Sequence, residues 1–153
     1  MTVPDPRTPE QRKQDTLDRL RNDVDAWVAT ADEGGGEPYL VPLSFLWDGA
    51  TLLMATASAS PTARNLLATR RVRVGIGLVR DVVLIEGTAE ATPATEIPAE
   101  TGEAFAEKTG FDPRKSSGPY HYFRLTPVRV QAWREANELA GRDLMRDGEW
   151  VVA

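Results

Sequence analysis

Residues Pro38–Leu66 read PYLVPLSFLWDGATLLMATASASPTARNL, and this stretch decides the fold. Apolar residues at every second position predict a strand over Pro38–Trp47. Asp48-Gly49 then predicts a hairpin turn, with a returning strand over Thr51–Thr56. Two strands joined this tightly are antiparallel, so the stretch predicts the start of an antiparallel sheet.

Pro42 lies inside the first of these strands. Proline has no backbone N–H, so it cannot donate to a neighbouring strand. We therefore expect this position to face an edge of the sheet, a bulge or a ligand cleft.

The same stretch ends in a hydroxyl-rich turn that leads into a helix. Ser60 is a favoured N-cap and proline suits the first helical position, which predicts a helix over residues 61–69. Thr56, Ser58 and Thr62 add hydroxyl groups that the cap itself does not need.

The rest of the chain predicts further short strands and two more helices. We expect helices from Thr8 to about Asn22 and over 99–109, strands over 26–30, 71–79, 82–89 and 120–134, and a hairpin turn at 146–149. Successive strands with short turns favour an antiparallel meander, and about six strands of this length close into a small barrel. The sequence thus predicts a mainly β protein with a few peripheral helices. Its single domain spans residues 8–153, after a flexible arm of residues 1–7.

Composition excludes several classes of site. The 153 residues include no cysteine and one histidine, which excludes disulfides, thiol catalysis and metal sites built on several histidines. No apolar run reaches membrane-spanning length, and the N-terminal residues lack an apolar signal core. With a net charge of −5, we expect a cytoplasmic protein that binds neither nucleic acid nor membrane.

Charge is unevenly distributed. Residues 49–80 contain no Asp or Glu but five arginines, at positions 64, 70, 71, 73 and 80. The segment is either a local anion site or a chance cluster of solvated arginines, and the charges alone leave both open.

The hydroxyl-rich turn favours the anion site. Helix N-termini attract phosphate, and Arg64 can bind one through two hydrogen bonds. A plain cap would explain only Ser60 and Pro61. The following strand also has a nearly bare second face, with Gly75 and Gly77, and such glycines often mark a close approach to the backbone. We therefore favour a ligand that carries a phosphate.

Familiar catalytic motifs are absent: the chain has no GxSxG, P-loop or HExxH sequence. His121 has no nucleophile beside it in the sequence, and a lone histidine in an aromatic strand is more often structural. An enzyme built from this chain would depend on a bound cofactor. Tyr120, His121 and Tyr122 are the candidate proton donors.

Three segments together resemble a known family: VPLSFLWDGATLLMATASASPTARNLLATRRVRVGIG (Val41–Gly77), RDVVLIEGTAEA (Arg80–Ala91) and VQAWREANELAGRDL (Val130–Leu144). Their order is similar to that of the flavin-binding split β-barrels, the pyridoxamine 5′-phosphate oxidase-like proteins. The similarity covers roughly residues 20–153. It is greatest to the actinobacterial branch that uses the deazaflavin F420 or FMN.

The resemblance implies a homodimer of split barrels with two cofactor clefts at the subunit interface. It places the cofactor ring beside Val41, Pro42, Leu43 and Ser44, and the phosphate near Thr56, Ala57, Ser60, Thr62, Arg64 and Asn65. Trp133 and Arg142 match positions that lie near the flavin of the neighbouring subunit.

The chain also departs from the family pattern. True oxidases carry basic residues at the positions of Tyr39, Ser44 and Thr62, which are uncharged here. The arginine and histidine that bind the substrate phosphate before Arg142 have no counterpart. Oxidation of pyridoxine 5′-phosphate is therefore not expected, and both F420 and FMN remain open as cofactors.

Three hypotheses follow. The first is an oxidoreductase that uses FMN or F420 to move a hydride to or from a small organic substrate. The second is a binding module that holds a flavin-like or other phosphorylated ligand without turnover. The third is a structural dimer in which the bare glycine face packs against its twin.

Overall fold

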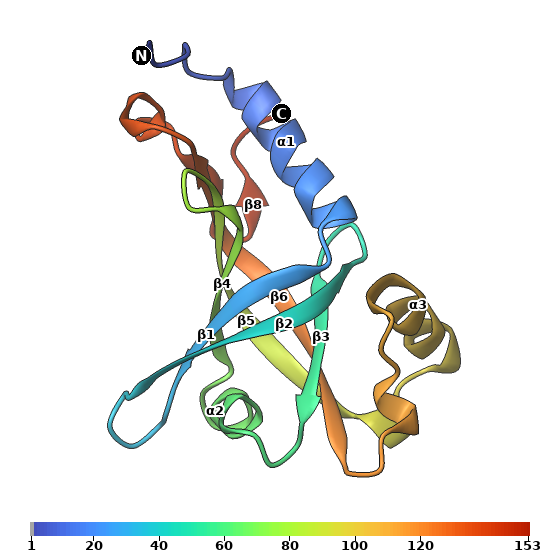
Figure 1. The fold of residues 1–153 in the computed structure, drawn as a ribbon. Coiled ribbons are helices and arrows are strands. Elements are labelled where there is room, and N and C mark those ends of the chain that lie inside the picture. Colours follow the sequence, from blue (N-terminus) through green and yellow to red (C-terminus); the bar gives the residue numbers. More distant parts are fainter. Residues whose placement is uncertain (1) are drawn as a thin grey trace.

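The structure is a computed structural model that describes residues 2–153. Its helices are α1 (Pro9–Asn22), α2 (Pro61–Thr69) and α3 (Ala99–Thr109), with short 3-10 turns η1 (Ala94–Glu96), η2 (Pro113–Lys115) and η3 (Ala136–Glu138). Its strands are β1 (Asp25–Ala31), β2 (Pro38–Trp47), β3 (Leu52–Ala57), β4 (Arg71–Leu78), β5 (Asp81–Pro93), β6 (Tyr120–Trp133), β7 (Asp143–Arg146) and β8 (Glu149–Trp150). Figure 1 shows the helices around the outside of the strands.

Six antiparallel strands close into a barrel. They are neighbours in the order β3-β2-β1-β4-β5-β6, and β3 also pairs with β6. The β7–β8 hairpin continues the sheet beyond β6. The predicted small antiparallel barrel with peripheral helices is confirmed.

Two apolar clusters fill the fold. The larger includes Val28, Phe45, Val74, Ile85 and Leu125 and lies inside the barrel. The smaller consists of Leu53, Ala55, Phe105 and Tyr122, where α3 packs on the outside of β3 and β6. Alternate residues of β3 and β6 thus serve different clusters, as the period of a strand requires.

Most element bounds match the prediction, and β5 is the main exception. It runs to Pro93 rather than to the predicted end at Ala89, because its second half pairs with the first half of β6. Such a distant partner leaves no local mark in the sequence. The pairing of β5 with β6 shifts register beside Pro127: Glu86 pairs with Arg129 and Gly87 with Pro127, so β6 has one extra residue there.

The two aspartate-glycine turns differ in length. At residues 147–148 the predicted hairpin has a two-residue loop, and both Asp147 (φ 51°) and Gly148 (φ 79°) have positive φ. The loop after β2 has four residues instead of two. There the Asp48 carboxylate accepts the N–H groups of Ala50 and Thr51, which holds the wider turn.

The second face of β4 carries two glycines, Gly75 and Gly77, and local packing explains one of them. Gly77 has a φ of +92°, and an added Cβ would lie 2.5 Å from the Asp81 carbonyl oxygen and 2.7 Å from the Arg19 guanidinium. The turn into β5 and the Arg19 side chain therefore require this glycine. Gly75 differs, because an added Cβ there would make only an ordinary 3.5 Å contact with Leu84.

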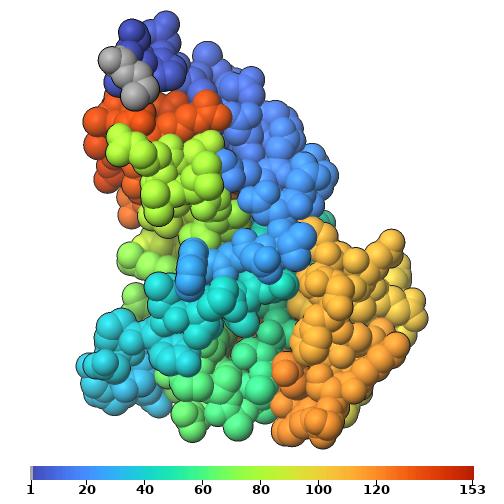
Figure 2. All heavy atoms as spheres, in the orientation of Figure 1, coloured from blue at the N-terminus to red at the C-terminus, as the bar shows by residue number. Residues whose placement is uncertain are grey.

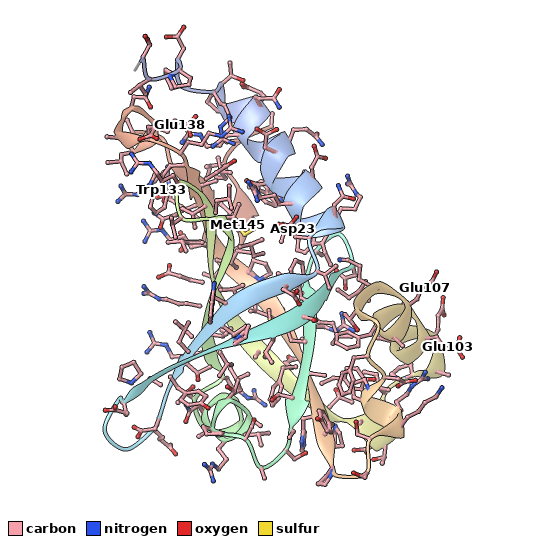
Figure 3. The ribbon with its side chains drawn as sticks, viewed as in Figure 1. Asp23, Glu103, Glu107, Trp133, Glu138 and Met145 are labelled. Atoms are coloured by element: carbon pink, nitrogen blue, oxygen red, sulfur yellow. The ribbon has the colours of Figure 1, made fainter. Side chains whose placement is uncertain are left out.

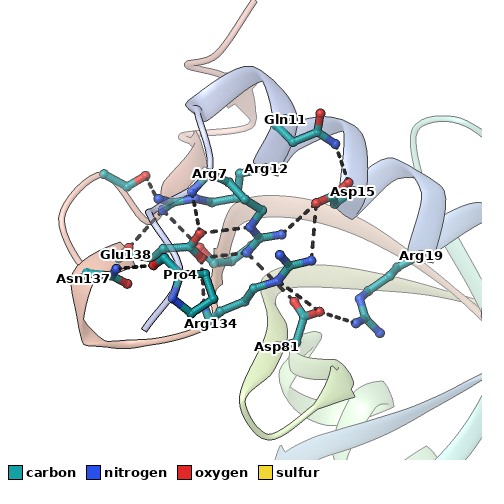
Figure 4. A network of polar contacts seen from close by, with 12 residues as sticks. Pro4, Arg7, Gln11, Arg12, Asp15, Arg19, Asp81, Arg134, Asn137 and Glu138 are labelled. Atoms are coloured by element: carbon teal, nitrogen blue, oxygen red, sulfur yellow. Dashed lines mark hydrogen bonds and ion pairs between the residues drawn. The ribbon is translucent and has the colours of Figure 1, made fainter. Parts of the chain in front are cut away.

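Charged side chains fasten α1 and the segment before it to the loop after β6 (Figure 4). The Glu138 carboxylate, 3% exposed, accepts from the Arg7 guanidinium at 2.7 and 3.0 Å and from the backbone N–H groups of Arg7 and Arg134. These bonds hold the pKa of Glu138 at about 2, against an ordinary value of 4.5. This ion pair is almost fully shielded from solvent.

Arg12 fixes the same loop from the helix itself. It is 4% exposed, and one guanidinium nitrogen donates to the carbonyl oxygens of Ala132, Glu138 and Gly141 at 3.0–3.3 Å. The Arg12 guanidinium thus ties together the carbonyl groups before, within and near the end of the loop after β6.

The predicted N-terminal arm, residues 1–7, contacts this region. Asn137 donates to the Pro4 carbonyl oxygen at 2.9 Å, and Arg7 is bound as described above. Residue 1 lies outside the described residues. Mobility of the arm in solution, and the single-domain boundary at residue 8, stay predictions.

No helix within residues 2–153 is long and apolar enough to cross a membrane.

We predict that Glu138→Gln lowers the free energy of unfolding by about 3 kcal/mol at neutral pH, the equivalent of the depressed pKa of Glu138. Because that pKa is lowered on folding, the stabilisation is complete above about pH 5 and disappears as the pH falls toward about 2. Urea unfolding at several pH values would measure it.

The matched control for this experiment is Glu103→Gln, at an exposed position on α3 (Figure 3). It should change stability by less than about 0.5 kcal/mol. A constant difference between Glu138→Gln and wild type from pH 7 to pH 2 would contradict the assigned role of the Glu138 charge.

Candidate functional site

The turn between β3 and α2 is held together by hydroxyl groups. Ser60 caps α2: its Oγ accepts the Ala63 N–H at 3.1 Å, as the sequence predicted. The Thr56 and Ser60 hydroxyls are hydrogen-bonded at 3.1 Å, and the Ser60 N–H donates to the Ala57 carbonyl oxygen. The predicted Thr56, Ala57 and Ser60 thus come together at one helix N-terminus.

Arg64 completes this turn on the outside. It lies in the first turn of α2, is exposed, and forms no ion pair with any residue in the 2–153 range. Pro61 brings no N–H, and Ala63 has already donated its own to Ser60. This turn therefore offers no row of free N–H groups to an anion. The attraction would come instead from the positive end of the helix dipole, the hydroxyls and Arg64.

Thr62 and Asn65 lie on the inner side of α2. Thr62 is 1% exposed, and the buried Asn65 side chain donates to the Thr30 hydroxyl on β1 at 3.1 Å. The structure thus gives Asn65 a role in fastening α2 to the barrel. The contact with a phosphate that the resemblance implies for both residues stays a prediction.

The predicted ring-binding segment, Val41–Ser44, lies on an open strand edge. β2 pairs with β1 over Pro38–Ser44 and with β3 only from Phe45 onward. The Phe45 N–H points to the β1 side, where it donates to the Val24 carbonyl oxygen. Because successive residues of a strand point their N–H groups to opposite sides, Pro42 and Ser44 face the open side. The expectation that Pro42 faces an edge is confirmed.

Around this edge the structure places Leu43 half-buried and Pro42 exposed. The Ser44 hydroxyl is bound by the Asp25 carboxylate at 2.7 Å. Since α2 contacts β2, the open edge and the hydroxyl-rich turn belong to one region of the molecule.

His121 joins the turn, which sequence reasoning missed. It pairs across the barrel seam with Thr56, and its Nδ1 is hydrogen-bonded to the Ser58 hydroxyl at 2.7 Å. The Ser58 N–H also donates to the Pro119 carbonyl oxygen. No local signal could have found these contacts, because they depend on the pairing of β3 with β6.

The two tyrosines beside His121 are placed differently. Tyr122 is fully buried beneath α3, and its hydroxyl has no hydrogen-bond partner. This burial raises the pKa of Tyr122. Tyr120 packs against Phe111, with ring centres 5.5 Å apart. Among the three candidate proton donors, His121 is the one whose side chain is hydrogen-bonded to the turn in the described structure.

Trp133 and Arg142 lie together but far from the turn. The Arg142 guanidinium carbon lies 5.6 Å from the centre of the Trp133 ring, in cation–π geometry. Both residues flank the loop that Arg12 and Glu138 hold. Figures 1 and 3 place Trp133 near α1, at the opposite end of the barrel from α2. Within one protomer, Trp133 and Arg142 are therefore distant from the hydroxyl-rich turn.

An exposed apolar face lies on the outside of β1, β4 and β5. Trp27 (55% exposed), Gly75 and Leu84 are cross-strand neighbours in one row. Leu78 and Val79 extend this face into the β4–β5 turn, which lies at the surface beside α1 (Figure 2). These residues line a mainly apolar hollow of about 340 Å³. Contiguous apolar surface of this kind is typical of an interaction site.

Metal binding has no support in the described part of the chain. Residues 2–153 bring no three side chains of the metal-binding types together.

Comparisons with solved structures show the same fold. A Listeria innocua protein assigned as a pyridoxamine 5′-phosphate oxidase is 18% identical over 82% of this chain and 98% of its own, with a TM-score of 0.62. A structure named F420 reductase is 17% identical over 74% of this chain and 93% of its own, with a TM-score of 0.59. An FAD-binding protein from Mesorhizobium loti is 21% identical over 77% and 89%, with a TM-score of 0.61.

None of the curated proteins matches the sequence. The family model described as pyridoxamine 5′-phosphate oxidase does match, and it covers residues 15–134, from α1 to the loop after β6. That range contains the barrel, the hydroxyl-rich turn and the open edge of β2. The chain belongs to the pyridoxamine 5′-phosphate oxidase family.

Proposed function

We propose that the protein is a flavin-dependent oxidoreductase that uses F420 or FMN to move a hydride to or from a small organic substrate. The supporting observation is the exposed Arg64, without an ion-pair partner in residues 2–153, at a capped turn lined by hydroxyls and next to the open edge of β2. Solved structures of similar fold carry names that include F420 reductase and FAD-binding protein.

The residues present fit such a cofactor. Arg64, Ser60 and Thr56 would hold the phosphate, while the open edge of Val41–Ser44, on the side away from β1, would lie beside the ring. The cofactor supplies the hydride chemistry when it is bound. The chain's own part is to bind and orient it and to leave one side open to substrate.

The substrate is not pyridoxine 5′-phosphate in this proposal. Tyr39 is exposed, Thr62 is buried and the Ser44 hydroxyl is bound by Asp25, so none of the three supplies a positive charge to the cleft. We also propose a cytoplasmic location, as the sequence predicts.

We further propose a homodimer, with a cofactor cleft at each end of the interface. The apolar row of Trp27, Gly75 and Leu84 would pack against a second copy. A second copy would also supply Trp133 and Arg142 to the turn of the first. This arrangement would explain both the exposed apolar row and the distance between the Trp133–Arg142 pair and the turn within one protomer.

A second candidate is a binding module that holds the cofactor without turnover. It is favoured by the small number of charged groups at the cleft, since Arg64 alone faces outward from the turn. Binding without reduction or reoxidation by any small organic substrate would support this alternative.

We predict that Arg64→Ala weakens binding of FMN or F420 by about 1.5–3 kcal/mol, because a charge-assisted hydrogen bond to phosphate is lost. Binding of riboflavin, which has no phosphate, should not change. Fluorescence titration of the purified protein with each ligand would measure both affinities.

Arg71→Ala is the matched control, an exposed arginine at the start of β4, and it should leave all affinities unchanged. An equal loss of riboflavin affinity in Arg64→Ala would show that Arg64 does not contact phosphate. If wild-type protein binds neither cofactor saturably, the proposed function is wrong.

We also predict that Leu84→Glu converts a dimer into a monomer, because it places a charge within the apolar row. Light scattering after size-exclusion chromatography would measure the mass, and cofactor affinity should fall with it. Phe111→Glu, an exposed aromatic residue outside this row, serves as control and should stay dimeric. A dimeric Leu84→Glu would place the interface elsewhere.

A further inference from the structure

A second hollow adjoins the hydroxyl-rich turn at Ser58. Its volume is about 400 Å³, and it lies between the start of β6 and the segment that runs from η1 through α3 to η2. Ser58 belongs both to the turn and to the wall of this hollow. The polar side chains of the wall are Ser58, Thr95, Arg114, Ser116, Tyr120 and His121.

The charge of this wall is unusual for an acidic protein. It contains no Asp or Glu, although the whole chain has a net charge of −5. By contrast, the apolar hollow beside Trp27 includes Glu86, and a further hollow between β1, β4 and β5 includes Glu86, Asp32 and Glu33. A wall of hydroxyls, an imidazole and a guanidinium, free of carboxylates, suits an anionic group.

Arg114 is held in place rather than free. It forms two hydrogen bonds with Asp112, at 2.8 and 2.9 Å, and lies against α3, where an added Cβ on Gly102 would meet it at 2.8 Å. Asp112 offsets most of its charge. The hollow therefore favours groups that accept several hydrogen bonds, such as carboxylates, over a second phosphate dianion.

The Ser58–His121 pair supplies donors at the mouth of the hollow. When Ser58 donates to Nδ1, the imidazole proton lies on Nε2, which becomes a donor of its own. When Nδ1 donates instead, the Ser58 hydroxyl hydrogen is free for a ligand. Either arrangement offers one hydrogen-bond donor beside the turn.

We propose that this hollow binds a carboxylate-bearing extension of the cofactor beyond its phosphate. The inference rests on the proposed function and deepens it, because it selects between the two cofactors. FMN ends in a phosphate monoester, which the turn alone would satisfy. F420 continues through a phosphodiester into a lactyl and oligoglutamate tail, and Ser58 lies where that tail would leave the turn.

The test compares two ligands that differ only in the tail: F420, and the same deazaflavin ending at its 5′-phosphate. Wild-type protein should bind F420 about tenfold more tightly, the effect of about one hydrogen bond to a charged group. Ser58→Ala and His121→Leu should reduce this preference to about twofold and leave affinity for the short ligand unchanged. Ser117→Ala, an exposed serine of the same loop, is the control.

A second measurement does not depend on mutation. His121 is the one histidine of the chain, so its imidazole proton signals are identified directly by NMR. F420 should shift them and the short ligand should not. Equal affinity for the two ligands, or unshifted His121 signals at saturation with F420, would overturn the tail site and leave the proposed function intact. Failure of both ligands to bind would instead overturn the proposed function and the tail site with it.

Discussion

The pairing of β3 with β6 is the constraint on which the rest of the structure depends. It closes the barrel, because it joins the first and last of the six strands. It also sets the register that brings His121 opposite Thr56, and so places an aromatic strand beside the hydroxyl-rich turn. On its other edge β3 pairs with β2 only from Phe45 onward, so β2 has a partner on one side only over Val41–Ser44. Barrel closure and the open binding edge therefore both depend on how β3 pairs with its two neighbours.

The two ends of the barrel are stabilised by different kinds of interaction. At the α2 end the contacts are short polar bonds among small side chains, and they leave Arg64 exposed. At the α1 end, buried charges hold the loop that carries Trp133 and Arg142, through Glu138 and Arg12. Breaking one partner of a buried ion pair is far more costly than losing a surface contact, so this loop is held rigidly. A rigid loop at one end and an open turn at the other suit a cleft that is completed between two copies of the chain.

The sequence could predict what depends on near neighbours. Ser60-Pro61 marked the start of α2, Gly110 the end of α3, and Asp147-Gly148 a tight turn, because each works through the backbone geometry of a few residues. Contacts between distant segments were out of reach. Asn65 reaches Thr30, His121 reaches Ser58, and β5 continues to Pro93 only because β6 lies beside it. Candidate site residues could therefore be identified, but their partners and orientations could not.

The acid-free arginine segment shows why charge patterns need a structure. Arg73 and Arg80 form ion pairs with Glu86 and Glu135, which lie outside the segment, so part of the cluster is neutralised once the chain folds. Arg70 ends α2 in a left-handed conformation, and Arg71 begins β4 at a distance from the capped end of the helix. Only Arg64 remains at the positive end of the helix dipole without a carboxylate partner among the residues described. Chance clustering therefore accounts for most of the five arginines, while the position of this one in the first turn of α2 makes it a specific feature for binding an anion.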